Sequence, residues 1–139
     1  IRDVAVTGVQ TCALPILLTV HAQIEEEIFY PACQGEADGA DDLVAEAKVE
    51  HQSAKDLIAK IRASRPGSSD YDAHVTVLGE YIRHHVKEEQ NELFPKARKS
   101  DLDLKALGEQ LATRKSALMK SGNGKAGVGR WLADRLTAG

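Results

Sequence analysis

Apolar residues recur every three or four positions along three stretches of the chain, as in helices that bury one face. The clearest inward line contains Tyr71, Val75, Leu78, Ile82, His85 and Glu89. A second contains Val44, Ala47, His51, Ala54, Ile58 and Ile61, and a third contains Leu14 or Leu18, His21, Glu25 and Ile28. No stretch shows the alternating pattern of a strand. The sequence therefore predicts an all-α fold.

Clusters of turn-forming residues separate these helices at residues 34–42 (QGEADGADD) and 64–72 (SRPGSSDYD). The predicted N-terminal caps are Asp38, Asp41 or Asp42 for the helix after the first cluster, and Ser69, with Asp72 in a capping box, for the next. Pro31 and Pro95 are expected to end or kink their helices, because proline has no backbone N–H.

A further helix is predicted from about residue 101 to residue 120. Its apolar positions are Leu104, Leu107, Leu111 and Leu118. The glycine-rich stretch that follows predicts a flexible tail over residues 121–139. The C-terminal helix, assigned to residues 99–120, is expected to pack over the end of the bundle formed by residues 17–98.

The chain carries nearly the same polar pattern twice, in HAQIEEEIFYP (21–31) and HVKEEQNELFP (85–95). In each copy a His precedes a Glu by four residues, as His21 precedes Glu25 and His85 precedes Glu89. Positions four apart lie on the same face of a helix. Each copy therefore places an imidazole nitrogen beside a carboxylate oxygen, which is how helices hold metal ions.

These polar side chains lie on the inward lines, and His51 lies in the middle of its own line. A single inward His is more often a hydrogen-bonded core residue, and a single inward Glu is often part of an ion pair. Burying an unpaired carboxylate costs several kcal/mol, so two Glu and three His converging on one core need a compensating charge. The combined pattern predicts a metal site. Nitrogen and carboxylate donors suit iron or manganese, and zinc is also compatible.

Residues 17–98 resemble a hemerythrin-like HHE cation-binding domain, an up-down four-helix bundle around a non-haem di-iron centre. The resemblance is carried by HAQIEEEIFYPAC, by the VEH at 49–51 and by YIRHHVKEEQNELFPKAR. It implies two bound iron ions whose ligands are His21, Glu25, His51, His85 and Glu89. The two Glu side chains would bridge the irons.

Several neighbours of these residues are predicted not to bind the metal directly. Tyr30 and Tyr81 are expected beside the ligands. His84 is expected on the surface, because consecutive helical positions differ by about 100°. The flanking acidic residues are predicted to be solvated, with Glu26 or Glu88 as the one able to approach the metal.

The resemblance also implies an earlier helix with an Asp-His pair, and no His precedes His21. Residues 6–16 (VTGVQTCALPI) resemble a translated sequencing adapter, so residues 1–16 are predicted to be a non-native scar. The alternative for residues 4–20 is a signal peptide, but the basic n-region is lacking. A bundle without its native first helix is expected to have an apolar groove. The chain is then expected to aggregate, to dimerise through this groove, or to fill the groove partly with residues 10–20 or with the C-terminal helix.

Composition fits one cytoplasmic domain, with 42% hydrophobic and 28% charged residues among 139. The net charge of −3 argues against nucleic acid, and the absence of a long apolar run argues against a membrane span. Two cysteines make no disulfide framework.

Three functions are compatible with these features. The first is a non-enzymatic protein that binds or senses O2, NO or peroxide, in stress response or iron handling. The second is a di-iron peroxidase or oxidase. The third is a structural helical bundle with an incomplete metal site. The sequence leaves enzymatic activity undecided and favours a binding role.

Overall fold

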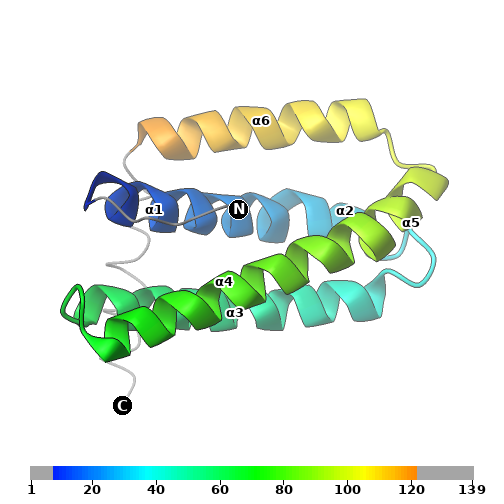
Figure 1. Cartoon of the computed structure of the whole chain (residues 1–139). Helices are drawn as coiled ribbons and strands as arrows, with labels where there is room; N and C mark the ends of the chain where they lie inside the picture. Colours follow the sequence, from blue (N-terminus) through cyan, green and yellow to red (C-terminus); the bar gives the residue numbers. More distant parts are fainter. Residues whose placement is uncertain (1–7, 122–139) are drawn as a thin grey trace, which may run out of the picture.

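The computed structural model describes residues 8–121, and the side chains of residues 14–121. Four helical rods make up this part of the chain, and no strand occurs in it (Figure 1). In chain order the elements are α1 (Gly8–Ile24), the π-helix η1 (Glu25–Phe29), α2 (Tyr30–Cys33), α3 (Asp41–Ala63), α4 (Ser69–Glu88), the π-helix η2 (Glu89–Leu93), α5 (Phe94–Lys99) and α6 (Leu104–Lys120). The predicted all-α fold is confirmed. The predicted tail and the start of the predicted scar, residues 122–139 and 1–7, lie outside the described residues.

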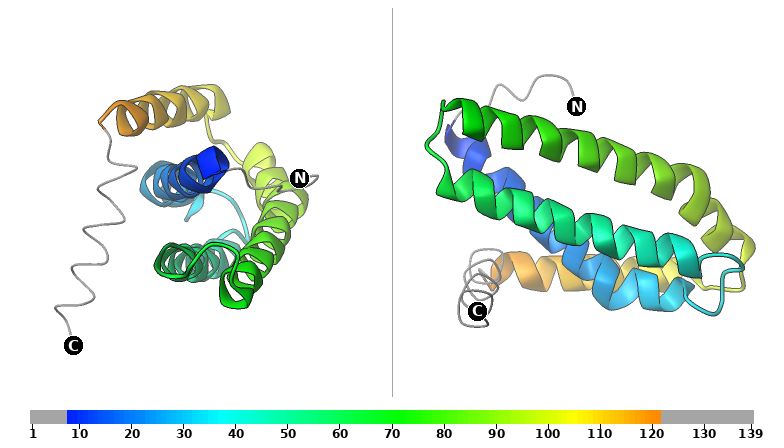
Figure 2. Two further views of the ribbon diagram at one scale, coloured as in Figure 1. Left: turned by 60° about the vertical axis from the view of Figure 1, so that its left-hand side comes forward. Right: turned by 90° about the horizontal axis from the view of Figure 1, so that it is seen from below.

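Consecutive rods run antiparallel to one another, so the arrangement is up-down (Figure 1). The most extensive contact between rods joins α3 to α4, and α6 packs along α1 and η1. Figure 2 shows α1 between α6 and α3 when the bundle is viewed near its end. The rod containing α1 therefore packs between α6 and α3. Residues 8–16, part of the predicted scar, form the first turns of this rod.

A π-helical turn precedes the proline in each copy of the repeated motif. The backbone N–H of Tyr30 donates to the carbonyl of Glu25, five residues earlier, and Phe94 donates to Glu89 in the same way. Of the two outcomes expected at Pro31, an end or a kink of its helix, the structure excludes the end, because α2 continues through this residue. Proline clashes with the carbonyl four residues before it, and a wider turn just upstream accommodates this within a continuous rod.

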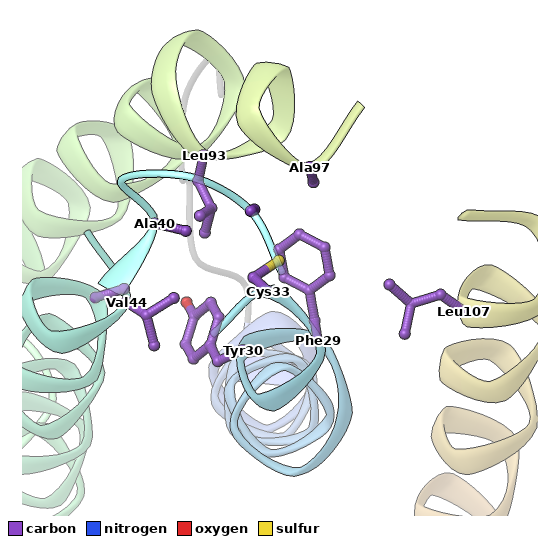
Figure 3. Packing of buried hydrophobic residues seen from close by; sticks show 10 residues of the cluster. Phe29, Tyr30, Cys33, Ala40, Val44, Leu93, Ala97 and Leu107 are labelled. Atoms are coloured by element: carbon purple, nitrogen blue, oxygen red, sulfur yellow. The ribbon is translucent and has the colours of Figure 1, made fainter. Parts of the chain in front are cut away.

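Two apolar clusters pack at opposite ends of the bundle. One contains Phe29, Tyr30, Cys33, Ala37, Ala40, Val44, Ala47, Leu93, Ala97 and Leu107 (Figure 3). The other contains Ile58, Ile61, Tyr71 and Leu78. Because α3 contributes to both clusters, His51 lies between them along this helix. The bundle therefore places the predicted polar residues between two apolar layers.

The caps of α3 and α4 differ from those predicted. Ala40 precedes α3 and no side chain caps that helix, so the predicted aspartate caps are wrong. Ala40 is fully buried, and an aspartate there would bury a charge. Gly39, with φ of 68°, supplies the left-handed turn before it. At α4 the cap is Ser68 and not Ser69, and its hydroxyl accepts from the Tyr71 N–H at 3.2 Å.

Helix α6 covers a face of α1 with its apolar side. Leu118 packs against Val20 and Ile24, and Leu107 joins the cluster around Phe29. The predicted apolar position Leu104 is 40% exposed. The C-terminal helix thus covers part of the first rod, which is one of the outcomes expected for the apolar groove. Dimerisation stays a prediction.

Leu118→Ala is expected to lower the free energy of unfolding by about 2–5 kcal/mol, the usual cost of emptying a buried leucine site. Leu118 is only 1% exposed, whereas its neighbour Met119 is 44% exposed. Met119→Ala should therefore change stability by less than about 0.5 kcal/mol. Denaturant unfolding measures both, and equal effects would contradict the packing of α6 on α1.

Candidate metal centre

The structure brings the predicted ligands together from three helical rods. Glu25, at the start of η1, and Glu89, at the start of η2, are both buried, as are His51 on α3 and His85 on α4. His21 lies one turn before Glu25, and its side chain is 54% exposed. Four of the five residues therefore share the core, and the fifth lies at its edge.

The donor atoms of these side chains are spaced as around a metal ion. Glu25 Oε2 is 3.1 Å from His51 Nε2, and its other oxygen, Oε1, is 2.9 Å from His21 Nε2. His85 Nε2 is 3.3 Å from Glu89 Oε1. Ligands with bonds of about 2.1 Å lie about 3.0 Å apart at octahedral angles and about 3.4 Å apart at tetrahedral angles. The separations fit either geometry.

Two groups of three donors can be distinguished, and Glu25 belongs to both. One group is Glu25, His51 and His85, and the other is His21, Glu25 and Glu89. Within each group one donor atom per residue lies within 4.8 Å of the others. A carboxylate shared between two donor groups is the arrangement that a pair of bridged cations requires.

Two further carboxylates orient the buried imidazoles. His51 Nδ1 lies 3.0 Å from Glu26 Oε1, and His85 Nδ1 lies 2.8 Å from Glu50 Oε2. An Nδ1–H that donates to a carboxylate leaves the Nε2 lone pair for a metal. Both Nε2 atoms face the centre, 3.1 Å from each other. The donor set thus fits a bound cation.

One of these two carboxylates, Glu26, was predicted from the sequence, and the other, Glu50, was missed. The sequence offered Glu26 as one of two acidic residues able to approach the metal. In the structure Lys55 also holds this carboxylate, with its Nζ 2.7 Å from Glu26 Oε1. Glu88, the other candidate, lies beside His84. Glu50 was missed, although it directly precedes His51. Its partner is His85 on another helix, so no spacing along the chain indicates this contact.

The hydroxyl of Tyr30 lies at the middle of the donor atoms. It is 3.0 Å from Glu89 Oε1, 3.2 Å from Glu25 Oε2 and 3.1 Å from His51 Nε2. The π turn makes this possible, because residues five apart lie far round from each other on an α-helix and close together across a π turn. Burial and the charges of Glu25 and Glu89 raise the pKa of Tyr30, so its O–H donates to the carboxylates.

Tyr81, the other tyrosine predicted beside the ligands, is 40% exposed and lies outside this group. The residue that corresponds to Tyr30 in the second copy is Phe94, five residues after Glu89. Phe94 packs edge-on against Phe29, with ring centroids 5.6 Å apart. The second copy therefore supplies an apolar ring where the first supplies a hydroxyl.

The charge balance of the site links metal binding to protons. Burial lowers the pKa of His85, but hydrogen bonds with Glu25, Glu89 and Glu50 outweigh it and raise this pKa to about 10. Burial also lowers the pKa of His51, but hydrogen bonds with Glu25 and Glu26 outweigh it, so this pKa is raised as well. Burial opposes ionisation of Glu25, yet contacts with His21, His51 and His85 hold its pKa far below the usual range. A metal ion must therefore displace protons from the imidazoles.

Cys33, at the end of α2, is fully buried. Burial and the nearby charge of Glu89 raise the pKa of its thiol to about 11. The thiol therefore stays protonated near neutral pH, when it is neither a good ligand nor a good nucleophile. Its role is packing, in the cluster around Phe29 and Tyr30.

A cavity of about 40 Å³ opens beside His21 and His51. It is lined by Leu18, Thr19, His21, Ala22, His51, Ala54, Lys55, Ile58 and Ile82. This volume exceeds the roughly 10–15 Å³ needed for one water molecule. Its mostly apolar wall suits a small uncharged molecule next to the donor atoms.

Tyr30→Phe is expected to lower the stability of the metal-free chain by about 1–3 kcal/mol, because the buried Glu25 and Glu89 lose a donor. Tyr81→Phe is the matched control and should change stability by less than about 0.5 kcal/mol. Thermal and denaturant unfolding in the presence of a chelator measure both. Equal small effects would show that the Tyr30 hydroxyl does not bridge the carboxylates.

Comparison with known proteins agrees with this geometry. Residues 10–97 match the family model of the hemerythrin HHE cation binding domain. The chain is 32% identical over 80 residues to a protein named DNA nickase from Nostoc sp. (strain PCC 7120 / SAG 25.82 / UTEX 2576), covering 55% of this chain and 21% of that protein. The chain thus spans about a fifth of the length of this relative. No solved structure matches the chain.

The family match includes all five predicted ligands and both π turns. None of the helices within residues 8–121 has the length and hydropathy needed to cross a bilayer. The match takes in well over half of the chain, and the bundle and its donor groups have the features that the family's name describes. The chain belongs to the hemerythrin HHE cation-binding domain family.

Proposed function

We propose that this chain binds two iron ions in a non-haem di-iron centre and uses them to bind or sense O2 or a related ligand such as NO or peroxide. The observation that carries the proposal is the pair of donor groups that share Glu25. Iron bound by nitrogen and carboxylate donors supplies reversible coordination of such ligands. Manganese and zinc are compatible with the same donors and compete for them.

Each side chain has a definite task in this proposal. Glu25 offers one oxygen toward His21 and the other toward His51, as a bridging carboxylate must. Glu89, in the group with His21, is the second candidate bridge. Glu26 and Glu50 hold the rings of His51 and His85 so that their Nε2 atoms face the centre. The Tyr30 O–H offers a hydrogen bond to a ligand held between the donors.

The two metal positions are not equivalent. The group with His51 and His85 has two nitrogen donors and is buried, whereas the group with His21 has one and opens to solvent. We therefore expect the position at His21 to bind its metal more weakly and to leave more sites for an external ligand. The apolar cavity beside His21 and His51 gives that ligand a place to enter.

A di-iron peroxidase or oxidase is the second candidate function. Turnover of peroxide benefits from a hydrogen-bond donor at the reacting oxygen, and the Tyr30 hydroxyl lies within 3.2 Å of Glu25, His51 and Glu89. Steady consumption of peroxide with a reductant would favour this function over binding. A bundle that retains no iron would favour the purely structural alternative.

We place the protein in the cytoplasm and its ligand among small uncharged molecules and peroxide. The name of the Nostoc relative points to DNA, but the net charge of −3 gives no support to a nucleic-acid partner for this chain. A dimer through the apolar groove predicted from the sequence remains part of the proposal. Size-exclusion chromatography tests it.

The deciding experiment is anaerobic titration of the metal-free chain with ferrous iron, followed by elemental analysis and exposure to O2 or NO. We expect about two irons per chain, and an absorption change on exposure that reverses when the ligand is removed. His51→Ala is the control and should show less iron and a weaker change. Absence of bound iron in the unaltered chain would overturn the proposal.

A further inference from the structure

A third group of metal-ligating side chains, apart from the two at the buried centre, lies on the outer side of the α3–α4 pair. His84 Nε2 is 3.3 Å from Glu88 Oε1 and 3.4 Å from Glu50 Oε1. The three donor atoms lie within 4.8 Å of one another. These separations again match the roughly 3.0–3.4 Å between ligands of one metal ion. His84 and Glu88 belong to neither of the two buried donor groups.

We propose that His84, Glu50 and Glu88 bind one divalent transition-metal ion at the surface, in addition to the buried centre. One imidazole and two carboxylates suit Mn²⁺, Fe²⁺ or Zn²⁺. The His84 side chain is 59% exposed, so water completes the coordination and the ion exchanges with solvent. This ion is held more weakly than those in the buried centre.

The ligands are already positioned by the fold. His84 and Glu88 are one turn apart on α4, and Glu50 reaches them from α3. The Glu50 side chain is only 10% exposed, and its second oxygen accepts from His85 Nδ1 at 2.8 Å. Binding therefore orders few groups that were free before, which favours affinity.

Glu50 connects the surface group to the buried centre. One of its oxygens faces His84 and the other holds the ring of His85, whose Nε2 faces the buried donors. A cation bound to Glu50 draws negative charge away from the carboxylate oxygen that contacts His85 Nδ1. Occupancy of the surface site is therefore coupled to affinity at the buried site, and the coupling is reciprocal.

The competing explanation is that His84 pairs with the two carboxylates and no metal is bound. His74 provides the comparison, because it lies on the same helix and pairs with Asp70 at 3.6 Å, also four residues away. Neither His74 nor Asp70 belongs to any of the candidate metal groups. A His with one carboxylate neighbour should bind no ion measurably, so His74 is the matched control for His84.

The test is titration of the full metal-free chain with Mn²⁺, in which electron paramagnetic resonance counts the free ion. We expect a tight class and one weaker ion per chain. His84→Ala and Glu88→Gln should each weaken that last ion at least tenfold and keep the tight class, whereas His74→Ala changes neither. His51→Ala should reduce the tight class and keep the weaker ion. Circular dichroism confirms that each variant stays helical.

Glu50→Gln tests the connection, because it should weaken both classes, the tight one by about 10–100-fold as for other carboxylates that orient a ligand histidine. The surface site is overturned if the weaker ion survives both His84→Ala and Glu88→Gln. A chain that lacks the tight class but keeps the weaker one would overturn the proposed buried centre and leave the surface site standing.

Discussion

Glu25→Ala is expected to abolish tight binding of both proposed irons, because this carboxylate belongs to both buried donor groups. The loss in affinity should exceed about 100-fold, more than is usual for a residue that only orients a ligand. His51→Ala and Glu89→Ala each remove a donor from only one group, so each should leave an intermediate iron content. Elemental analysis after gel filtration measures the three variants.

His84→Ala is the control for this series. The His84 ring faces away from the buried centre and contacts Glu50 and Glu88 at the surface. The His84→Ala variant should bind as much iron at the buried site as the unaltered chain, whatever the effect of the substitution on a weak surface ion. Equal losses of tight iron in all four variants would show that the assignment of buried and surface faces is wrong.

Metal loading is expected to stabilise the fold strongly. The two buried donor groups join three helical rods, so the folded chain binds the metal far better than the unfolded chain. A free metal concentration of about 1,000 times the dissociation constant adds about 4 kcal/mol to the unfolding free energy. Denaturant unfolding with and without a chelator measures this, and identical midpoints would contradict metal binding at these residues.

The size of this stabilisation should grow with pH. The pKa of His85 rises from 6.5 to about 10 in the metal-free fold, so its proton stabilises that fold fully below pH 6.5. This contribution is lost as the pH rises through about 10. Metal binding needs the deprotonated ring, so affinity changes in the opposite direction. The gain on metal loading should therefore be larger at about pH 8 than at about pH 6.5, and a smaller gain would contradict the proton competition.

The sequence by itself determined the helices, through the apolar period, and the pairing of His with Glu, through the repeated motif. His21 with Glu25 and His85 with Glu89 are four residues apart, and that spacing sets their common face in any α-helix. The apolar period placed His51 between core positions, where the structure also has it. These are local properties of one helix, so they can be predicted from spacing alone.

Contacts between helices could not be predicted in this way. Glu50 holds His85 across the α3–α4 interface, and a separation of 35 positions along the chain carries no signal of the contact. The exposure of His21 likewise depends on how the other rods pack around α1. Such contacts follow from the packing of whole helices against one another, which no local spacing encodes.

Tyr30 shows the limit of helical periodicity most clearly. An ideal α-helix turns Tyr30 far from Glu25, and the π turn before Pro31 brings its hydroxyl within 3.2 Å of that carboxylate. The same turn exists in the second copy, where Phe94 takes the place of the tyrosine and Tyr81 stays at the surface. Spacing along the chain determined which residues could be ligands. The tertiary structure decided which side chains meet them, because one extra residue per turn and the packing of neighbouring rods change the direction of each side chain.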